Sequence, residues 1–280
     1  MTLQLKTENL NVHLSGRHIL KDISVPSLAA GELVGVIGPN AAGKSTLLRS
    51  LAGLQRYTGI ARLHAGAGAE MQDIARMTPA QRIREIAYLP QQIPQVSSLT
   101  VYELLLASLQ IAGLSNGAEK DATTISGVLN KLDLGEYAMR PLSELSGGKR
   151  QLVAVAMVLL KKPKVLLLDE PTSALDLRWQ VEVLNLTRRY LQEHNALALI
   201  AIHDLNLALR QCNRLIVLND GEIAADCASR ELDSEVIRRV YGVDARIELC
   251  SNGDPVVLLT AVETGASQSV VEHMNMMEKQ

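Results

Sequence analysis

The chain has 280 residues, enough for one large domain with a sizeable core. Hydrophobic residues make up 47% of it, but aromatic residues only 2%, and phenylalanine is absent. The core is therefore expected to be aliphatic, which suits parallel strands covered by helices on both faces. The net charge of −2 provides no basic field for nucleic acid, so we expect no nucleic-acid partner.

The first fifth of the chain predicts strands followed by a helix. Residues 1–31 alternate between apolar and polar and contain turn signals, which indicates an antiparallel edge sheet. The apolar run Leu33–Ile37 is typical of a buried parallel strand. A helix is predicted after it, because leucines recur at helical spacing at positions Leu47, Leu48, Leu51 and Leu54.

The segment GPNAAGKST lies between this strand and this helix. That is the context in which a Gly-rich loop cradles nucleotide phosphates with its backbone N–H groups. Lys44 is expected to reach the β- and γ-phosphates, Ser45 to offer its hydroxyl to Mg²⁺, and Thr46 to contact the α-phosphate. The expected nucleotide-binding residues of this loop are Gly38, Pro39, Asn40, Ala41, Ala42, Gly43, Lys44, Ser45 and Thr46.

The middle of the chain changes from β to helical pattern. A Gly- and Ala-rich stretch, residues 59–78, predicts a hairpin and a loop, and Ile86–Leu89 predicts a short strand. Thr100 and Glu103 form a T-x-x-E capping box, which marks a helix start. Residues 100 to about 140 are predicted to form a small helical subdomain inserted into the α/β core.

A second Gly-rich turn, LSGGK at Leu145–Lys149, opens the apolar run LVAVAMVLL. It is built like another helix N-terminus aimed at phosphate. One nucleotide does not need two such turns from the same chain unless two chains share it. This turn therefore predicts a nucleotide site made by two subunits.

The elements after this turn alternate between strands and helices. The strand in VLLLDEP is followed by a polar helix at about 176–193 and by the buried strand Ala196–Ile202. Residues 214–223 predict a hairpin with its turn at Asp220–Gly221. Beyond Ser251 the pattern is weak, and we expect the end, HMNMMEKQ, to fray.

The two Gly-rich motifs together with VLLLDEP resemble the ATP-binding cassette (ABC) ATPase family over nearly the whole chain. The resemblance implies an α/β fold of the P-loop NTPase (RecA-like) type, with a parallel-sheet core, an antiparallel β subdomain and an inserted α-helical subdomain. It implies an ABC ATPase domain at 1–250, with the helical subdomain at about 92–145, and a C-terminal extension at 251–280.

The acidic pair of VLLLDEP lies at the carboxyl end of its strand, where open α/β sheets bind ligands. Because side chains alternate along a strand, the two should have different roles. Asp169 is expected to hold Mg²⁺ through water, and Glu170 to orient and deprotonate the attacking water.

Two further catalytic residues are implied by the resemblance. The family's loop glutamine directly follows a strand, which favours Gln91 over the adjacent Gln92 as the residue that touches Mg²⁺ and the attacking water. His203 matches the histidine that hydrogen-bonds the γ-phosphate and helps to place the catalytic carboxylate.

The resemblance also implies the assembly. Ser146, Gly147 and Gly148 would contact the γ-phosphate of ATP held by the other subunit of a head-to-tail homodimer. The segment SALD, residues 173–176, resembles the loop that crosses the dimer interface.

The chain departs from the family pattern at Lys149, where Gln or Glu is commoner. It also departs in the first hairpin, where Leu14 or His13 replaces the aromatic residue that stacks on adenine.

The segments HDLNLA and VYGVDARI resemble cassettes that drive import of iron–siderophore, haem and vitamin B12 chelates. We therefore expect an ATP-hydrolysing importer subunit for an iron–siderophore or related metal chelate, working through a separate permease and, indirectly, an extracytoplasmic binding protein. The longest apolar run, Leu152–Leu160, is too short to span a bilayer, so a peripheral place on the cytoplasmic side of the inner membrane is expected.

The alternatives are a non-transport ABC ATPase, a P-loop kinase or GTPase, and a scaffold that binds ATP with negligible turnover. A monomeric P-loop kinase or GTPase would have no need of the LSGGK turn at Leu145–Lys149. Glu170 and His203, the expected catalytic residues, are both present, which argues against a scaffold with negligible ATP turnover.

Overall fold

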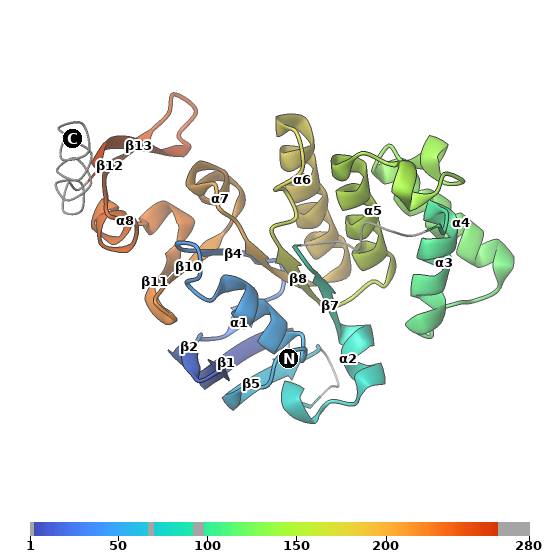
Figure 1. Ribbon diagram of the computed structural model, residues 1–280, viewed down its shortest axis with the longest axis horizontal. Helices are drawn as coiled ribbons and strands as arrows, with labels where there is room; N and C mark the ends of the chain where they lie inside the picture. The colour runs from blue at the N-terminus through green and yellow to red at the C-terminus, as the bar shows by residue number, and fades with distance from the viewer. Residues whose placement is uncertain (1–2, 67–69, 92–97, 263–280) are drawn as a thin grey trace, which may run out of the picture.

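The computed structural model describes residues 3–66, 70–91 and 98–262, and its centre is a six-stranded sheet (Figure 1). The strand order is β11-β10-β4-β9-β8-β7, in which every neighbouring pair is parallel except β10 and β11. Its strands are β4 (Leu33–Ile37), β7 (Ile86–Leu89), β8 (Val165–Asp169), β9 (Leu197–Ala201), β10 (Arg214–Asn219) and β11 (Glu222–Ala228). The strand predicted at Leu33–Ile37, the strand at Ile86–Leu89 and the hairpin that turns at Asp220–Gly221 are confirmed.

A second, antiparallel sheet lies beside it with the order β2-β1-β5-β6, and β3 also pairs with β1. The strands are β1 (Gln4–Leu14), β2 (Arg17–Ile23), β3 (Leu28–Ala29), β5 (Thr58–His64) and β6 (Gln72–Asp73). The antiparallel sheet predicted for residues 1–31 is confirmed. The hairpin predicted within 59–78 is the β5–β6 pair, but β5 makes most of its pairing with β1.

Helices cover the central sheet on both faces (Figure 1). They are α1 (Lys44–Leu51), α2 (Pro79–Glu85), α3 (Val101–Ile111), α4 (Ala118–Lys131), α5 (Gly147–Leu160), α6 (Leu177–His194), α7 (Leu205–Gln211) and α8 (Ser234–Tyr241). Helix α1 packs with the antiparallel sheet in one hydrophobic core, and α3 to α7 form the other. The predicted α/β fold with an antiparallel β subdomain and an inserted helical subdomain is confirmed.

Strand β8 divides its side chains between these two cores. Leu166 and Leu168 belong to the core with α5 and α6, whereas Val165 and Leu167 belong to the core with α1. Period-two alternation therefore directs Asp169, the last residue of the strand, toward α1.

Three parts of the chain differ from the sequence expectations. Helix α1 ends at Leu51, and Leu54 beyond it is 61% exposed. Helix α2 was missed, although Thr78 and Gln81 form a capping box in front of it. The weak pattern beyond Ser251 conceals β13 (Pro255–Val262), which pairs with β12 (Val243–Leu249). The end at 273–280 lies outside the described residues.

The β1–β5 pairing contains an irregularity that only glycine fits. The register shifts between Glu8 and Asn11, and Gly59 on the opposite strand has φ +89°. A Cβ on Gly59 would lie 2.0 Å from the backbone oxygen of Asn9. Both the backbone conformation and the space exclude a side chain at this position.

We expect Gly59→Ala to lower the free energy of unfolding by several kcal/mol, because the left-handed conformation costs about 1–2 kcal/mol and the clash adds to it. Gly16→Ala is the matched control. Gly16 also has positive φ, but a Cβ there meets nothing within 4 Å. Urea denaturation of both variants measures the difference, and equal losses would contradict the steric account.

Candidate active site

The loop at 38–46 connects β4 to α1 at the carboxyl edge of the central sheet. Gly38 has φ +147°, and a Cβ there would lie 2.2 Å from the backbone oxygen of Leu218. Ala41 and Gly43 also have positive φ, at 64° and 103°. These conformations turn the loop tightly into the helix, which leaves the first N–H groups of α1 directed toward a bound anion.

The side chain of Lys44 lies inside this loop. Its Nζ donates to the backbone oxygens of Gly38 and Pro39, both at 2.8 Å. Burial lowers the pKa of Lys44, and the carboxylates of Glu170 and Asp169 oppose that effect. The ammonium is therefore placed between the loop backbone and two acidic residues, Asp169 at the end of β8 and Glu170 just after it.

Asp169 is buried between two hydroxyl donors. Ser45 Oγ donates to its Oδ1 at 2.9 Å, and Tyr88 OH donates to its Oδ2 at 3.1 Å. Burial raises the pKa of Asp169, whereas the hydrogen bonds from Ser45 and Tyr88 lower it. Asp169 is 2% exposed, so its carboxylate is screened from bulk water.

Glu170 is held by side chains from the two neighbouring strands. Gln91 Nε2, after β7, donates to Glu170 Oε2 at 2.8 Å, and His203 Nε2, after β9, hydrogen-bonds Glu170 Oε1. The structure thus brings Gln91, Glu170 and His203 together, as the sequence predicts. Gln92, the alternative to Gln91, lies outside the described residues.

The backbone of Glu170 is fixed as firmly as its side chain. Its φ of +50° is uncommon for a residue with a Cβ. Its carbonyl oxygen accepts hydrogen bonds from Ser173 Oγ at 3.1 Å and from Gln151 Nε2 at 3.5 Å. The turn after β8 therefore holds the carboxylate at one position above the sheet edge.

A cleft of about 510 Å³ joins these groups. It is lined by Leu14, Ile19, Asn40, Ala41, Ala42, Gly43, Lys44, Ser45, Thr46, Gln91, Glu170 and His203. Of the two residues considered for adenine contact, Leu14 lines the cleft. The ring of His13 instead stacks on His18, with centroids 4.1 Å apart.

The LSGGK residues are not among those that line the cleft. Ser146 is the N-cap of α5 and its side chain accepts from the backbone N–H of Lys149, while Gly147 begins the helix. A Cβ on Gly147 would meet nothing within 4 Å. Lys149 turns its Nζ over the ring of Tyr137 at 3.4 Å from the centroid, which satisfies its charge by a cation–π contact.

Three residues of the site were missed from the sequence. Tyr88 and Gln151 contact the acidic pair, and Tyr241 at the end of α8 is placed beside the backbone of Gly38. Burial raises the pKa of Tyr241 to about 12, an effect that the hydrogen bond with Gly38 opposes. The only signal for Tyr88 was its place in a strand next to VLLLDEP, which does not say which way it points.

Comparison with known proteins identifies the family to which this chain belongs. The family model described as ABC transporter matches residues 20–173, more than half of the 280. The chain belongs to the ABC transporter family. Its ATP-binding cassette binds ATP and is an ATPase. The dimeric ATP-binding cassette MJ0796, solved in a post-hydrolysis state with ADP and phosphate, superposes with TM-score 0.70 at 25% identity, covering 81% of this chain and 100% of that one.

Two relatives extend the similarity over nearly the whole length. The iron(3+)-hydroxamate import ATP-binding protein FhuC of Bacillus subtilis is 35% identical, with 91% of this chain and 94% of the relative covered. The hemin import ATP-binding protein HmuV of Bradyrhizobium diazoefficiens is 38% identical, with 91% and 96% covered. Within residues 3–66, 70–91 and 98–262, no helix is long and apolar enough to cross a membrane.

We expect Tyr88→Phe to raise the Mg²⁺ concentration needed for half-maximal ATPase activity several-fold, because Asp169 loses a donor that stabilises its charged form. Loss of that donor raises the pKa of Asp169 further. As the pH falls, the carboxylate of the variant then becomes protonated at a higher pH than that of the wild type. The acid limb of the pH–rate profile should therefore move to higher pH. Tyr102→Phe, in α3, is the control. An unchanged Mg²⁺ requirement and pH profile would show that the hydrogen bond has no role.

Proposed function

We propose that this chain is the ATP-hydrolysing subunit of an importer that takes up an iron–siderophore or related metal chelate. The observation that carries the catalytic part is the carboxylate of Glu170, fixed between Gln91 and His203 at the edge of the phosphate-loop cleft. The import function rests on similarity to FhuC and HmuV over nearly the full length of the chain.

The oxygen groups beside Lys44 fit a Mg²⁺ ion bound together with ATP. Ser45 Oγ and the Asp169 carboxylate are hard ligands that already lie within 2.9 Å of each other. Mg²⁺ is held by one or two such protein groups, and its other ligands are water and phosphate. In this proposal Ser45 and Asp169 hold the ion, with Gln91 beside it, and the ion supplies charge neutralisation of the phosphates.

Glu170 then acts as the general base. A water molecule between its carboxylate and the γ-phosphorus would lose a proton to Glu170 as its oxygen attacks, and ADP would leave with the β–γ bridging oxygen. His203 fixes Oε1 and would also hydrogen-bond the γ-phosphate, while Gln91 fixes Oε2. Lys44 would move from the carbonyls of Gly38 and Pro39 to the phosphates, exchanging two neutral acceptors for charged ones.

ATP turnover in this proposal needs a second copy of the chain. Ser146, Gly147 and Gly148 begin α5, away from the cleft residues, with N–H groups free for an anion from outside the chain. A head-to-tail homodimer with C₂ symmetry would bring them to the γ-phosphate of the partner's ATP. ATP binding would close the pair and hydrolysis would release it.

The remaining partners follow from the relatives' names. FhuC and HmuV are import ATP-binding proteins, and an importer needs membrane-spanning permease subunits to carry its cargo. We place the chain peripherally on the cytoplasmic side of the membrane, bound to such a permease and coupled through it to an external substrate-binding protein. The permease and that binding protein would select the chelate, with iron–hydroxamate and hemin as the two cargoes favoured by similarity.

The test uses Glu170→Gln, which removes the base but keeps the shape of the site. ATPase activity should fall by about 10²–10⁴-fold, while ATP and Mg²⁺ should convert the protein to a dimer in size-exclusion chromatography with light scattering. Asp220→Asn, in the β10–β11 turn, should behave as the wild type. A variant that stays monomeric at saturating ATP would refute the shared site.

The transport assignment is tested with the same variant, purified in mild detergent from native membranes with ATP and Mg²⁺. A multi-spanning permease in the eluate would support the importer, and its identity would narrow the cargo. A protein found only in the soluble fraction, alone or with soluble partners, would favour a non-transport ABC ATPase.

A further inference from the structure

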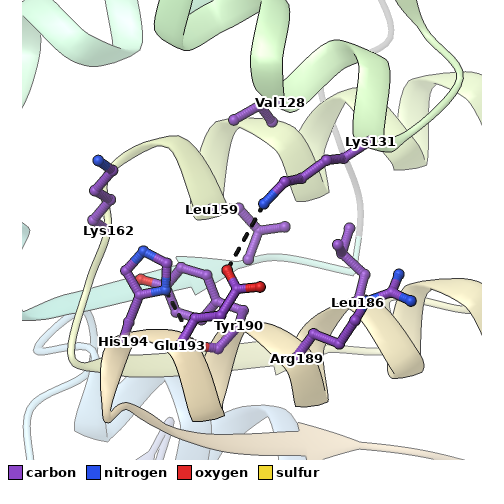
Figure 2. Close-up of a pocket in the computed structure, with 9 residues that line it drawn as sticks. All are labelled: Val128, Lys131, Leu159, Lys162, Leu186, Arg189, Tyr190, Glu193 and His194. Atoms are coloured by element: carbon purple, nitrogen blue, oxygen red, sulfur yellow. Dashed lines mark hydrogen bonds and ion pairs between the residues drawn. The ribbon is translucent and has the colours of Figure 1, made fainter.

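A cavity of about 320 Å³ lies between α4, α5 and α6, and Figure 2 shows its lining. The residues around it are Val128, Lys131, Leu159, Lys162, Leu186, Arg189, Tyr190, Glu193 and His194. None of these residues lines the nucleotide cleft. Its volume falls within the range of pockets that hold small organic molecules.

The floor of the cavity is apolar and rigid. Leu159 is 8% exposed and Leu186 is 6% exposed, and both belong to the large core under the helical face. Tyr190 is fixed from both sides, since its hydroxyl donates to the backbone oxygen of Pro163 and its ring stacks on His194. Val128 of α4 closes the side opposite α6 (Figure 2). A flat apolar group would therefore meet apolar surface on both sides.

The rim of the cavity carries more positive than negative charge. Lys131, Lys162 and Arg189 face it, against the single carboxylate of Glu193. Lys131 Nζ lies 3.8 Å from Glu193, and Arg189 pairs at 2.7 Å with Glu182 outside the cavity. Within the described residues, Lys162 makes no ion pair, so its charge is available to a ligand.

The position of Lys162 is unusual. It follows the end of α5 with φ +50°, a conformation more typical of glycine or asparagine there. Lysine at this point places a cation at the edge of the cavity (Figure 2), where glycine would give an easier turn. His194 adds a second polar edge: its Nδ1 hydrogen-bonds the backbone oxygen of Tyr190, which leaves Nε2 for a ligand.

One opposing effect has to be weighed. Helices α4, α5 and α6 all end beside the cavity, and their C-terminal carbonyls carry partial negative charge. That field decays within the last turn and is screened at the surface, whereas the three side-chain cations can move to contact a bound group. The balance favours an anion with one charge rather than a polyanion such as a nucleotide triphosphate.

We propose that this cavity binds a small organic monoanion with a flat apolar body, whose rings lie on Leu159, Leu186 and Tyr190 and whose charge meets Lys162. The site is separate from the catalytic one. Helix α5 has 14 residues, so its cavity end lies about 20 Å from its LSGGK end at about 1.5 Å per residue. A ligand here would join α4 of the helical subdomain to α6 of the core.

The test uses 8-anilinonaphthalene-1-sulfonate, which carries one permanent negative charge on naphthyl and phenyl rings, and its neutral counterpart N-phenyl-1-naphthylamine. Both are titrated by fluorescence into the full-length chain saturated with ADP and Mg²⁺, so that the nucleotide cleft is occupied. We expect one anionic probe per chain, and a melting temperature that rises with probe concentration.

Three variants separate charge from shape. Lys162→Asn introduces a residue that tolerates positive φ. It should lower the affinity for the anionic probe about five-fold and change the affinity for the neutral probe less than about two-fold. Val128→Phe narrows the cavity and should lower the affinity for both probes. Lys120→Gln, on the exposed start of α4, should change neither.

The outcome that would overturn the proposal is a wild-type affinity for the anionic probe in both Lys162→Asn and Val128→Phe, or binding of many probes per chain. Equal weakening of both probes by Lys162→Asn would also overturn it, because the lysine would then act through packing and not through charge. All three variants lie outside the catalytic residues, so their ATPase activity without probe serves as the folding control.

Discussion

The site depends on one constraint: parallel strands present their carboxyl ends at a single edge of the sheet. Strands β7, β8 and β9 are neighbours, so Gln91, Glu170 and His203 arrive side by side although they are far apart in the sequence. The phosphate loop follows β4, which pairs with β9 in the same sheet. The position of each proposed catalytic group is therefore set by the buried hydrogen-bond ladder beneath it.

The alternation of β8 gives the acidic pair two environments. Asp169 continues the face that packs on α1, and is buried beside Ser45 and Tyr88. Glu170 lies past the end of the ladder, with its backbone turned to φ +50° and its side chain in the cleft. A buried carboxylate suits a metal ligand, and a cleft carboxylate between two polar partners suits a base. The geometry thus supports different roles for two adjacent residues, one at the end of β8 and one just after it.

Much of the fold could be predicted because its signals are local. Gly31 and Gly38 flank the apolar run of β4, and Pro90 follows that of β7. Capping residues such as Thr100 and Asp176 mark where helices begin. Contacts between elements had no such signal. Tyr88 could be recognised only once β7 was seen to lie beside β8, and β13 is defined by its pairing with β12 and its contact with Asn206. Whether Leu14 or His13 lines the cleft depended in the same way on which side of β1 faces it.

The central claim is that one nucleotide is shared by two chains, and mixing two inactive variants tests it most directly. Lys44→Ala removes the phosphate-loop lysine. Gly147→Asp places a negative charge where the γ-phosphate of the partner should bind, at a position with room for a side chain. Each variant alone should be inactive. Their mixture should recover ATPase activity, because a mixed dimer has one site with both motifs intact. A mixture as inactive as its components, with mixed dimers present in native mass spectrometry, would contradict the shared site.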